Sequence, residues 1–246
     1  MTDKIIMKNS NIIINDLGIN NTVCIHDSIK LANKATIEIT IKGNNNKITI
    51  LEECNFKNTT IFIEGSKNSI LINKYVTFQG NIIVQFDKNS IDIGKLSSFG
   101  LVNLYCSEGC KISIGKNCMF SRNILLRTND GHSIINNETK EKINIAKDIY
   151  IGNYVWCGMN SNILKGAYIS SMTVIGAFST VTKKFPKKYI VIAGKPAKIV
   201  KEEIIWIKQS LANNITFNKN QISEIQKKCK RNKPWKSVLM RIIYGK

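Results

Sequence analysis

The strongest constraint on the fold is a six-residue period in the second half of the chain. From Ile145 onward every sixth residue is aliphatic or Cys, and these lead positions are Ile145, Ile151, Cys157, Ile163, Ile169, Ile175 and Val181. With 43% apolar residues in the chain, such a run arises by chance in roughly 0.3% of frames. The fifth place of each hexad is mostly small or β-branched, and Gly follows the lead residue at positions 152, 158 and 176. The period predicts a triangular solenoid in which each hexad forms one short strand and one corner.

The same frame extends upstream through Ile114, Phe120 and Leu126, and before them the period lengthens to 21 or 22 residues. Pairs of isoleucines mark this longer period after Asn- or Gly-containing turns: Ile48/Ile50, Ile70/Ile72, Ile91/Ile93 and Ile112/Ile114. We expect looser coils with longer corners there. An antiparallel sandwich uses similar strands, but it does not explain the strict sixes. The predicted fold class is therefore an all-β solenoid, with irregular coils over 1–110 and a hexapeptide-repeat β-helix over 111–200.

Two segments interrupt the repeat. A polar insertion over 128–144 contains His132, one of two histidines, and is expected to leave the solenoid wall as a loop. Residues 201–246 hold 11 Lys or Arg against 3 Glu, and the stretch 202–214 has a helical pattern. We expect this basic extension to form a helical cap on the open end of the solenoid.

Charge and cysteine usage narrow the class of protein. The net charge is +19, with 36 Lys and Arg against 17 Asp and Glu, which favours anionic partners. Heavy use of Ile, Asn and Lys weakens the inference to nucleic acid, and no recognition helix or RNA-binding motif supports it. No run of about 18 apolar residues predicts a membrane span, and seven Cys without a secretory signal fit the cytoplasm. Cys106 and Cys110 lack a second Cys/His pair at a zinc spacing, so no metal is expected.

Three segments resemble the hexapeptide-repeat acyltransferases with a left-handed parallel β-helix. They are NDGHSI at 129–134, IGNYVWCGMNSNILKGAYI at 151–169, and VIGAFSTVTKKFP with IAGKPAKIV within 174–200. The GHS loop followed by VWCG is most similar to the sialic-acid and capsular polysaccharide O-acetyltransferases. The resemblance implies acetyl transfer from acetyl-CoA, without an acyl-enzyme, in a homotrimer that binds the cofactor between two subunits.

The resemblance also implies catalytic residues. His132 is the candidate general base, because a sugar hydroxyl keeps its proton at neutral pH and a base with a pKa near 6.5 can remove it. Trp156, 24 residues later, is expected to shape the acyl site, and the backbone N–H at Met159 is the candidate donor to the developing oxyanion. Either Asp130 or a backbone carbonyl could orient the imidazole. Cys157 occupies an inward lead position and is expected to be inert.

The cofactor is expected at the last coils. By resemblance, the pantetheine arm bonds to the backbone at Gly176 and Ala177, and the lysines expected near the phosphates are Lys183, Lys195 and Lys198. Phe178 departs from the family's usual Gly at its position, which affects the expected path of that arm.

The predicted function is a cytoplasmic O-acetyltransferase that acts on a hydroxyl of a surface glycan, with sialic acid or polysialic acid preferred as the anionic acceptor. Two alternatives remain: N-acetylation of an amino-sugar nucleotide, and a non-catalytic solenoid that acts as a scaffold or binding protein. A serine acetyltransferase is disfavoured, because that family begins with a helical domain and this chain begins with strands. His26, in an early coil without a motif around it, is expected to be structural or on the surface.

Overall fold

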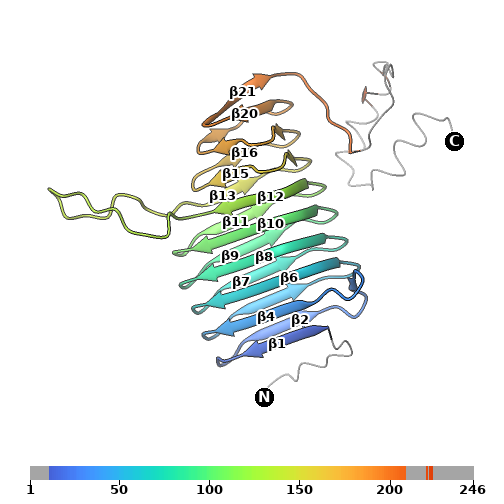
Figure 1. Cartoon of the computed structure of the whole chain (residues 1–246), viewed down its shortest axis with the longest axis vertical. Helices are drawn as coiled ribbons and strands as arrows, with labels where there is room; N and C mark the ends of the chain where they lie inside the picture. The colour runs from blue at the N-terminus through green and yellow to red at the C-terminus, as the bar shows by residue number, and fades with distance from the viewer. Residues whose placement is uncertain (1–10, 209–219, 221, 224–246) are drawn as a thin grey trace. The chain divides into compact units, whose positions relative to one another are not determined.

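The computed structural model describes residues 11–208, 220, 222 and 223. Met1–Ile204 forms one compact unit, in which two β-sheets wind into a solenoid (Figure 1). Paired strands are parallel except for β20 and β21, which form an antiparallel hairpin. The predicted all-β solenoid is confirmed, and the stack passes through residue 110 without a break in pairing, from β9 to β11 and from β10 to β12.

The larger sheet has 13 strands and supplies two sides of the triangular coils. Its strands are β1 (Ile12–Asp16), β3 (Lys30–Leu31), β4 (Ile37–Lys42), β6 (Asn55–Glu64), β8 (Thr77–Gln85), β10 (Ser98–Ser107), β12 (Met119–Arg127), β14 (Trp156–Cys157), β15 (Asn162–Leu164), β17 (Val174–Ile175), β18 (Thr180–Val181), β20 (Val191–Gly194) and β21 (Ala197–Lys201).

The smaller sheet has eight strands and supplies the third side. Its strands are β2 (Thr22–Ile25), β5 (Lys47–Ile50), β7 (Ser69–Ile72), β9 (Ser90–Ile93), β11 (Lys111–Ile114), β13 (Ile149–Ile151), β16 (Tyr168–Ile169) and β19 (Lys184–Phe185). Both members of each predicted isoleucine pair point inward here, and equivalent residues of successive coils pair in register: Ile48, Ile70, Ile91, Ile112 and Ile149. Stacked β-branched side chains fill the prism, as the longer period predicts.

Six of the seven hexad leads, from Ile151 to Val181, are buried in the core. The prediction is wrong at Ile145, whose side chain is 53% exposed. Ile145 lies before β13, in the segment that returns from the insertion, where no strand pairing continues the coil. The six-residue period holds only where the backbone is part of a coil.

The upstream coils are wider because one strand bends around a corner. β6, β8, β10 and β12 are each nine or ten residues long, and their pairing shifts register at a bulge, for example between Phe56 and Thr59. The wider interior holds a column of phenylalanines. The rings of Phe78 and Phe99 lie 5.2 Å apart between centroids, and those of Phe99 and Phe120 lie 4.7 Å apart and stacked. In the first hexapeptide coil Cys157 pairs with Phe120 and takes the next place in this column.

A series of asparagines joins one corner of the wide coils: half-buried Asn21 and buried Asn46, Asn68 and Asn89. The Oδ1 atoms of Asn21, Asn46 and Asn68 accept the backbone N–H of Asn46, Asn68 and Asn89 at 2.8–2.9 Å. The series ends where Cys110 N–H donates to Asn89 Oδ1 at 3.0 Å. Each amide therefore satisfies a corner N–H of the next coil, which strand pairing leaves open.

The predicted C-terminal helix is wrong at its start. Residues 202–208 contain no helix, and Glu203 has a φ of 57°, which no right-handed helix accommodates. Ile204 N–H instead donates to the carbonyl of Tyr189 at 3.0 Å. Apart from helical residues 220, 222 and 223, the predicted helical cap lies outside the described residues. No helix in the described part of the chain is long and apolar enough to cross a membrane.

Candidate active site

The insertion between β12 and β13 projects from the solenoid as an arm, which we define as residues 129–148 (Figure 1). Its two limbs pair through backbone hydrogen bonds, in which Ile143 N–H donates to Ile134 O at 2.9 Å and Asn136 N–H donates to Glu141 O at 2.9 Å. The predicted extruded loop is confirmed in position. Its base lies at the corner between the β12 side and the β13 side.

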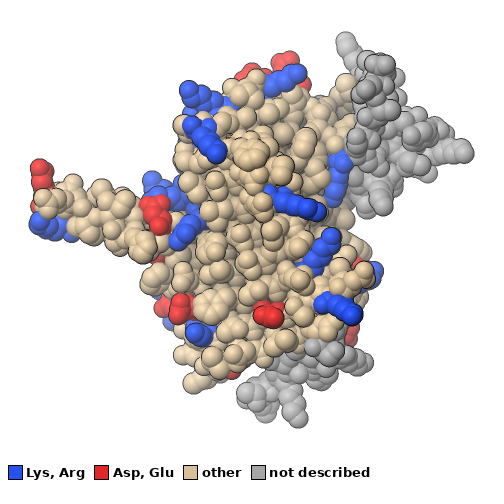
Figure 2. All heavy atoms as spheres, in the orientation of Figure 1, with Lys and Arg blue, Asp and Glu red and all other residues tan. Residues whose placement is uncertain are grey.

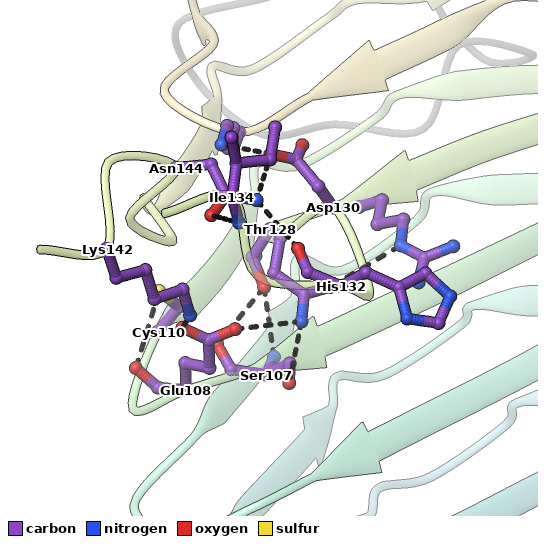
Figure 3. A network of polar contacts seen from close by, with 12 residues as sticks. Ser107, Glu108, Cys110, Thr128, Asp130, His132, Ile134, Lys142 and Asn144 are labelled. Carbon is purple, nitrogen blue, oxygen red and sulfur yellow. Dashed lines mark hydrogen bonds and ion pairs between the residues drawn. The ribbon is translucent and has the colours of Figure 1, made fainter. Parts of the chain in front are cut away.

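Asn144 holds the two limbs of the arm together at the base (Figure 3). Its Oδ1 accepts the N–H of Ile134 at 2.7 Å. Its Nδ2 donates to the carbonyl of His132 at 2.7 Å and to Asp130 Oδ2 at 2.9 Å. Because Asn144 is buried, these bonds fix the backbone of His132 while its imidazole stays exposed.

Glu108 ties the arm to the last wide coil. One carboxylate oxygen accepts Asn129 Nδ2 at 3.1 Å, and the other pairs with Lys142 Nζ at 2.5 Å. Asn129 Nδ2 also donates to Ser107 Oγ at 3.2 Å. The hydrogen bonds from Lys142 and then Asn129 lower the pKa of Glu108, so the carboxylate remains charged at neutral pH.

Of the two groups expected to orient the imidazole, Asp130 is paired with other side chains. Its Oδ2 pairs with Lys165 Nζ at 2.5 Å and accepts Asn144 Nδ2, and the Lys165 bond is the larger cause of its lowered pKa. Figure 3 shows the His132 ring directed away from the Asp130 carboxylate. Lys165 follows β15 in the next coil and draws Asp130 towards the hexapeptide region.

Trp156 and Met159 lie on a different side of the solenoid from the arm. Trp156 belongs to β14 and is 37% exposed, and Met159 is in the following corner and is 44% exposed. The described residues give the Met159 N–H no acceptor, while its carbonyl accepts the N–H of Phe178 at 2.8 Å. His132 makes its described hydrogen bond through its carbonyl to Asn144. One chain therefore does not bring these three residues together.

The two predicted backbone groups for the cofactor differ in what they can offer. Gly176 N–H donates to Ile192 O at 2.8 Å, and its carbonyl accepts the hydroxyls of Ser161 and Ser179 at 3.0 and 2.7 Å. Both backbone groups of Gly176 are thus used within the solenoid. Ala177 is exposed at the same corner, and its backbone has no described hydrogen bond, so it is the better placed of the two for a ligand.

The three predicted phosphate lysines are exposed near the end of the solenoid. Lys183 Nζ lies 5.5 Å from the ring centroid of Phe185, and Lys195 and Lys198 lie in or beside the β20–β21 hairpin. Their charges are therefore available to an anion at the last coils.

Cys157 is buried, as expected, and burial raises the pKa of its thiol. A neutral thiol inside the prism is not a nucleophile. His26 is exposed and shares a 3.0 Å hydrogen bond with Ser28 Oγ, so it lies on the surface of an early coil. Among the residues described, no group of three or more His, Cys, Asp or Glu could hold a metal ion.

Sequence reasoning missed Arg127, Asn144 and Lys165. Arg127 and Lys165 were hidden among many cations, and the position of Asn144 at the arm base depends on how the limbs pair. Asn129 lies at the start of the arm and Asn144 near its end, and this pair of Asn was the signal available in the sequence.

Comparison with known proteins finds no matching family model. The chain is 37% identical over 189 residues to a polysialic acid O-acetyltransferase from Neisseria meningitidis, which covers 77% of this chain and 86% of that one. It is 35% identical over 150 residues to a polysialic acid O-acetyltransferase from Escherichia coli O1:K1 / APEC, and that match spans 48% of the relative.

Two crystal structures are also similar. The polySia-specific acetyltransferase NeuO superposes with a TM-score of 0.78 at 34% identity, over 89% of this chain and 99% of that chain. The polysialic acid O-acetyltransferase OatWY superposes with a TM-score of 0.78 at 33% identity, over 86% and 99%. The similarity thus includes the wide coils, for which the sequence motifs alone gave no match.

Proposed function

This chain belongs to the polysialic acid O-acetyltransferases, and from that premise we propose that it transfers the acetyl group of acetyl-CoA directly to a hydroxyl of polysialic acid. The solenoid has the left-handed β-helix fold of these acetyltransferases. His132 acts as the general base, Trp156 lines the acyl site, and the Met159 N–H binds the developing oxyanion. The observation that carries the proposal is the exposed imidazole of His132 on an arm whose backbone Asn144 fixes.

The proton chemistry follows from that placement. The acceptor hydroxyl donates its proton to His132 as its oxygen attacks the thioester carbonyl, and the imidazolium then returns the proton to the departing CoA thiolate. Each transfer needs a base near neutral pKa that solvent-borne substrate can reach. The negative charge that develops on the carbonyl oxygen is stabilised by the N–H of Met159, to which the described residues give no acceptor.

The active form is a homotrimer in which each site lies between two subunits. His132 lies on the arm and Trp156 on another side of the same chain, so a second copy must supply one of them. The arm also carries exposed apolar side chains, which a neighbouring copy would cover: Ile134, Ile135, Ile143 and Ile145. Mass measurement in solution tests this assembly, and a stable, active monomer would contradict it.

Acetyl-CoA binds along the last coils. The exposed backbone of Ala177 bonds to the pantetheine arm, and Lys183, Lys195 and Lys198 attract the phosphates as flexible point charges. The side chain of Phe178, 55% exposed, lies beside Ala177 in sequence and flanks that path. Because acetyl-CoA is the donor, the reaction takes place in the cytoplasm.

An anionic polymer suits the surface charge. Figure 2 shows Lys and Arg spread over the visible face, with Asp and Glu side chains between them, and the chain as a whole carries a net charge of +19. Such a surface attracts a polyanion over the screening length of about 8 Å at physiological salt.

The test measures CoA release with polysialic acid and identifies the O-acetyl product by NMR. His132→Ala should lower kcat by 10²-fold or more, in line with general-base contributions of about 10²–10⁴. His26→Ala is the matched control, because it removes the chain's other imidazole from a coil far from the arm. Near-wild-type turnover by the His132 variant at saturating donor would remove His132 from the mechanism. No release with polysialic acid would overturn the proposed acceptor.

A further inference from the structure

Arg127 is held in one orientation directly beneath the arm. It is the last residue of β12, and its guanidinium lies over the ring of Tyr105, its partner in β10, with Cζ 5.3 Å from the centroid. Its Nε donates to Asn129 Oδ1 at 3.4 Å. The side chain is half-buried, so stacking and one hydrogen bond restrict a cation that would otherwise be mobile.

The terminal nitrogens of Arg127 lie against the turn that carries His132. A methyl group placed on Gly131 would come within 2.5 Å of Arg127 Nη2. Gly131 also has a φ of 85°, which side chains other than that of glycine rarely allow. Glycine thus lets the backbone beside His132 approach the guanidinium closely.

The terminal N–H groups of Arg127 have no described hydrogen-bond acceptor. The described residues form no ion pair with it within 4 Å and offer Nη1 and Nη2 no acceptor. Asp130 is close enough for Arg127 to be the last-named contributor to its lowered pKa, but the described bonds of Asp130 are those of its Oδ2 with Lys165 and Asn144, and it forms no ion pair with Arg127 within 4 Å. A fixed guanidinium with free terminal N–H groups is suited to bind a carboxylate through two parallel hydrogen bonds.

We propose that Arg127 binds the carboxylate of the acceptor sugar and so sets which residue of the acidic polymer presents its hydroxyl to His132. This inference rests on the proposed function and adds a specificity-determining residue to it. The arginine is unusual in this chain, because only four of its 36 cations are Arg and the rest are Lys. The planar guanidinium at the arm base can bind a carboxylate through two directed hydrogen bonds, whereas a lysine there would provide a charge without that directionality.

The test compares native polysialic acid with the same polymer amidated at its carboxyl groups, using kcat/KM and calorimetric binding to the CoA-loaded protein. The wild-type chain should prefer the native polymer by about 30- to 300-fold, the range expected from paired charge-assisted hydrogen bonds. Arg127→Gln should abolish this preference by lowering kcat/KM for the native polymer alone, and Arg127→Lys should restore part of it. The KM for acetyl-CoA and the oligomeric mass should not change.

Lys42→Gln is the matched control. Lys42 stacks over Phe62 on the same outer face, with Nζ 5.5 Å from the ring centroid, in a coil far from the arm. Loss of its charge should leave the preference for native polymer intact. A variant at Arg127 that keeps the wild-type preference, or that weakens both polymers equally, would overturn the inference.

The two proposals can fail separately. If the wild-type chain binds native polymer with an Arg127-dependent preference but does not acetylate it, the proposed function fails and the carboxylate site stands. If it acetylates the polymer without any dependence on Arg127, the carboxylate site fails and the function stands.

Discussion

In the wide coils before the arm and in the hexapeptide coils after it, equivalent side chains of successive coils stack inside the solenoid, but the side chains that stack differ. The wide coils bend one long strand around a corner and fill the extra space with the phenylalanine column and the asparagine series. The hexapeptide coils turn at every sixth residue and close on small buried groups such as Ser161, Thr173 and Ser179. Coil width and the size of the buried side chains therefore change together between the two regions.

The two regions also differ in what their exposed surfaces offer. In the hexapeptide coils Met159 and Ala177 lie at corners, where the described residues give the Met159 N–H and the Ala177 backbone no hydrogen-bond partner. In the wide coils the Asn series uses the corner N–H groups within the stack. The proposed chemistry therefore concentrates in the narrow region, and the wide region contributes support and the guanidinium of Arg127.

The largest effect is expected from the phenylalanine column. Phe99→Ala removes a buried ring that packs at a tilt against Phe78 and stacks on Phe120, and should lower the free energy of unfolding by about 3–5 kcal/mol. Denaturant unfolding measures it. Phe86→Ala, at a ring 62% exposed, is the control and should change stability by no more than about 0.5 kcal/mol. Equal losses in the two variants would mean that the column does not stabilise the wide coils.

A smaller loss is expected from the asparagine series. Asn68→Ala leaves the buried N–H of Asn89 without its acceptor and should cost about 1–3 kcal/mol. Asn81→Ala, which breaks an outer-face pair with Asn103 at 2.7 Å, should cost about 0.5 kcal/mol. Denaturant unfolding measures both variants. A larger loss of stability in Asn81→Ala than in Asn68→Ala would mean that the amides on the outer face, and not the buried series, stabilise the wide coils.

The smallest effect is expected in the narrow region. Cys157→Ser replaces a buried thiol with a hydroxyl and should cost about 1–2 kcal/mol if the hydroxyl stays unpaired, with kcat little changed because no acyl-cysteine forms. Mass spectrometry of the protein during turnover provides the check. A competent acetyl adduct on Cys157 would contradict direct transfer.

The stacked core positions could be predicted from the sequence wherever an apolar residue recurs at a fixed spacing. The isoleucine pairs and the hexad leads need only their own spacing, so Ile48 and Ile163 could be placed in the core directly. Ile145 failed because the period was carried across a segment that has left the coil. The phenylalanine column also repeats at 21 residues, as Phe78, Phe99 and Phe120 show, and the asparagines from Asn46 onward follow at 22 and 21. Their inward position could not be predicted from this spacing, because it depends on the bulges in the long strands.

The site was predicted less completely than the fold. His132 was found because motif residues surround it, while its supports come from distant coils: Glu108 lies 34 residues from Lys142, and Asp130 lies 35 from Lys165. Either Asp130 or a backbone carbonyl was expected to orient the imidazole, and the Asp130 carboxylate instead pairs with the Lys165 ammonium one coil away. Ion pairs between residues this far apart in sequence cannot be predicted from a local motif, because any of 36 cations could be the partner.

The anchoring of the arm has a consequence for how such chains can lengthen or shorten. Glu108 and Lys165 tie the arm to the one coil on each side of it, and the described ties reach no further upstream. Because each coil contacts mainly its neighbours, a gene could gain or lose a 21- or 22-residue coil before β8 without moving His132. Related chains can therefore differ in the number of wide coils before β8, whereas the two coils that flank the arm must be retained because they hold it in place.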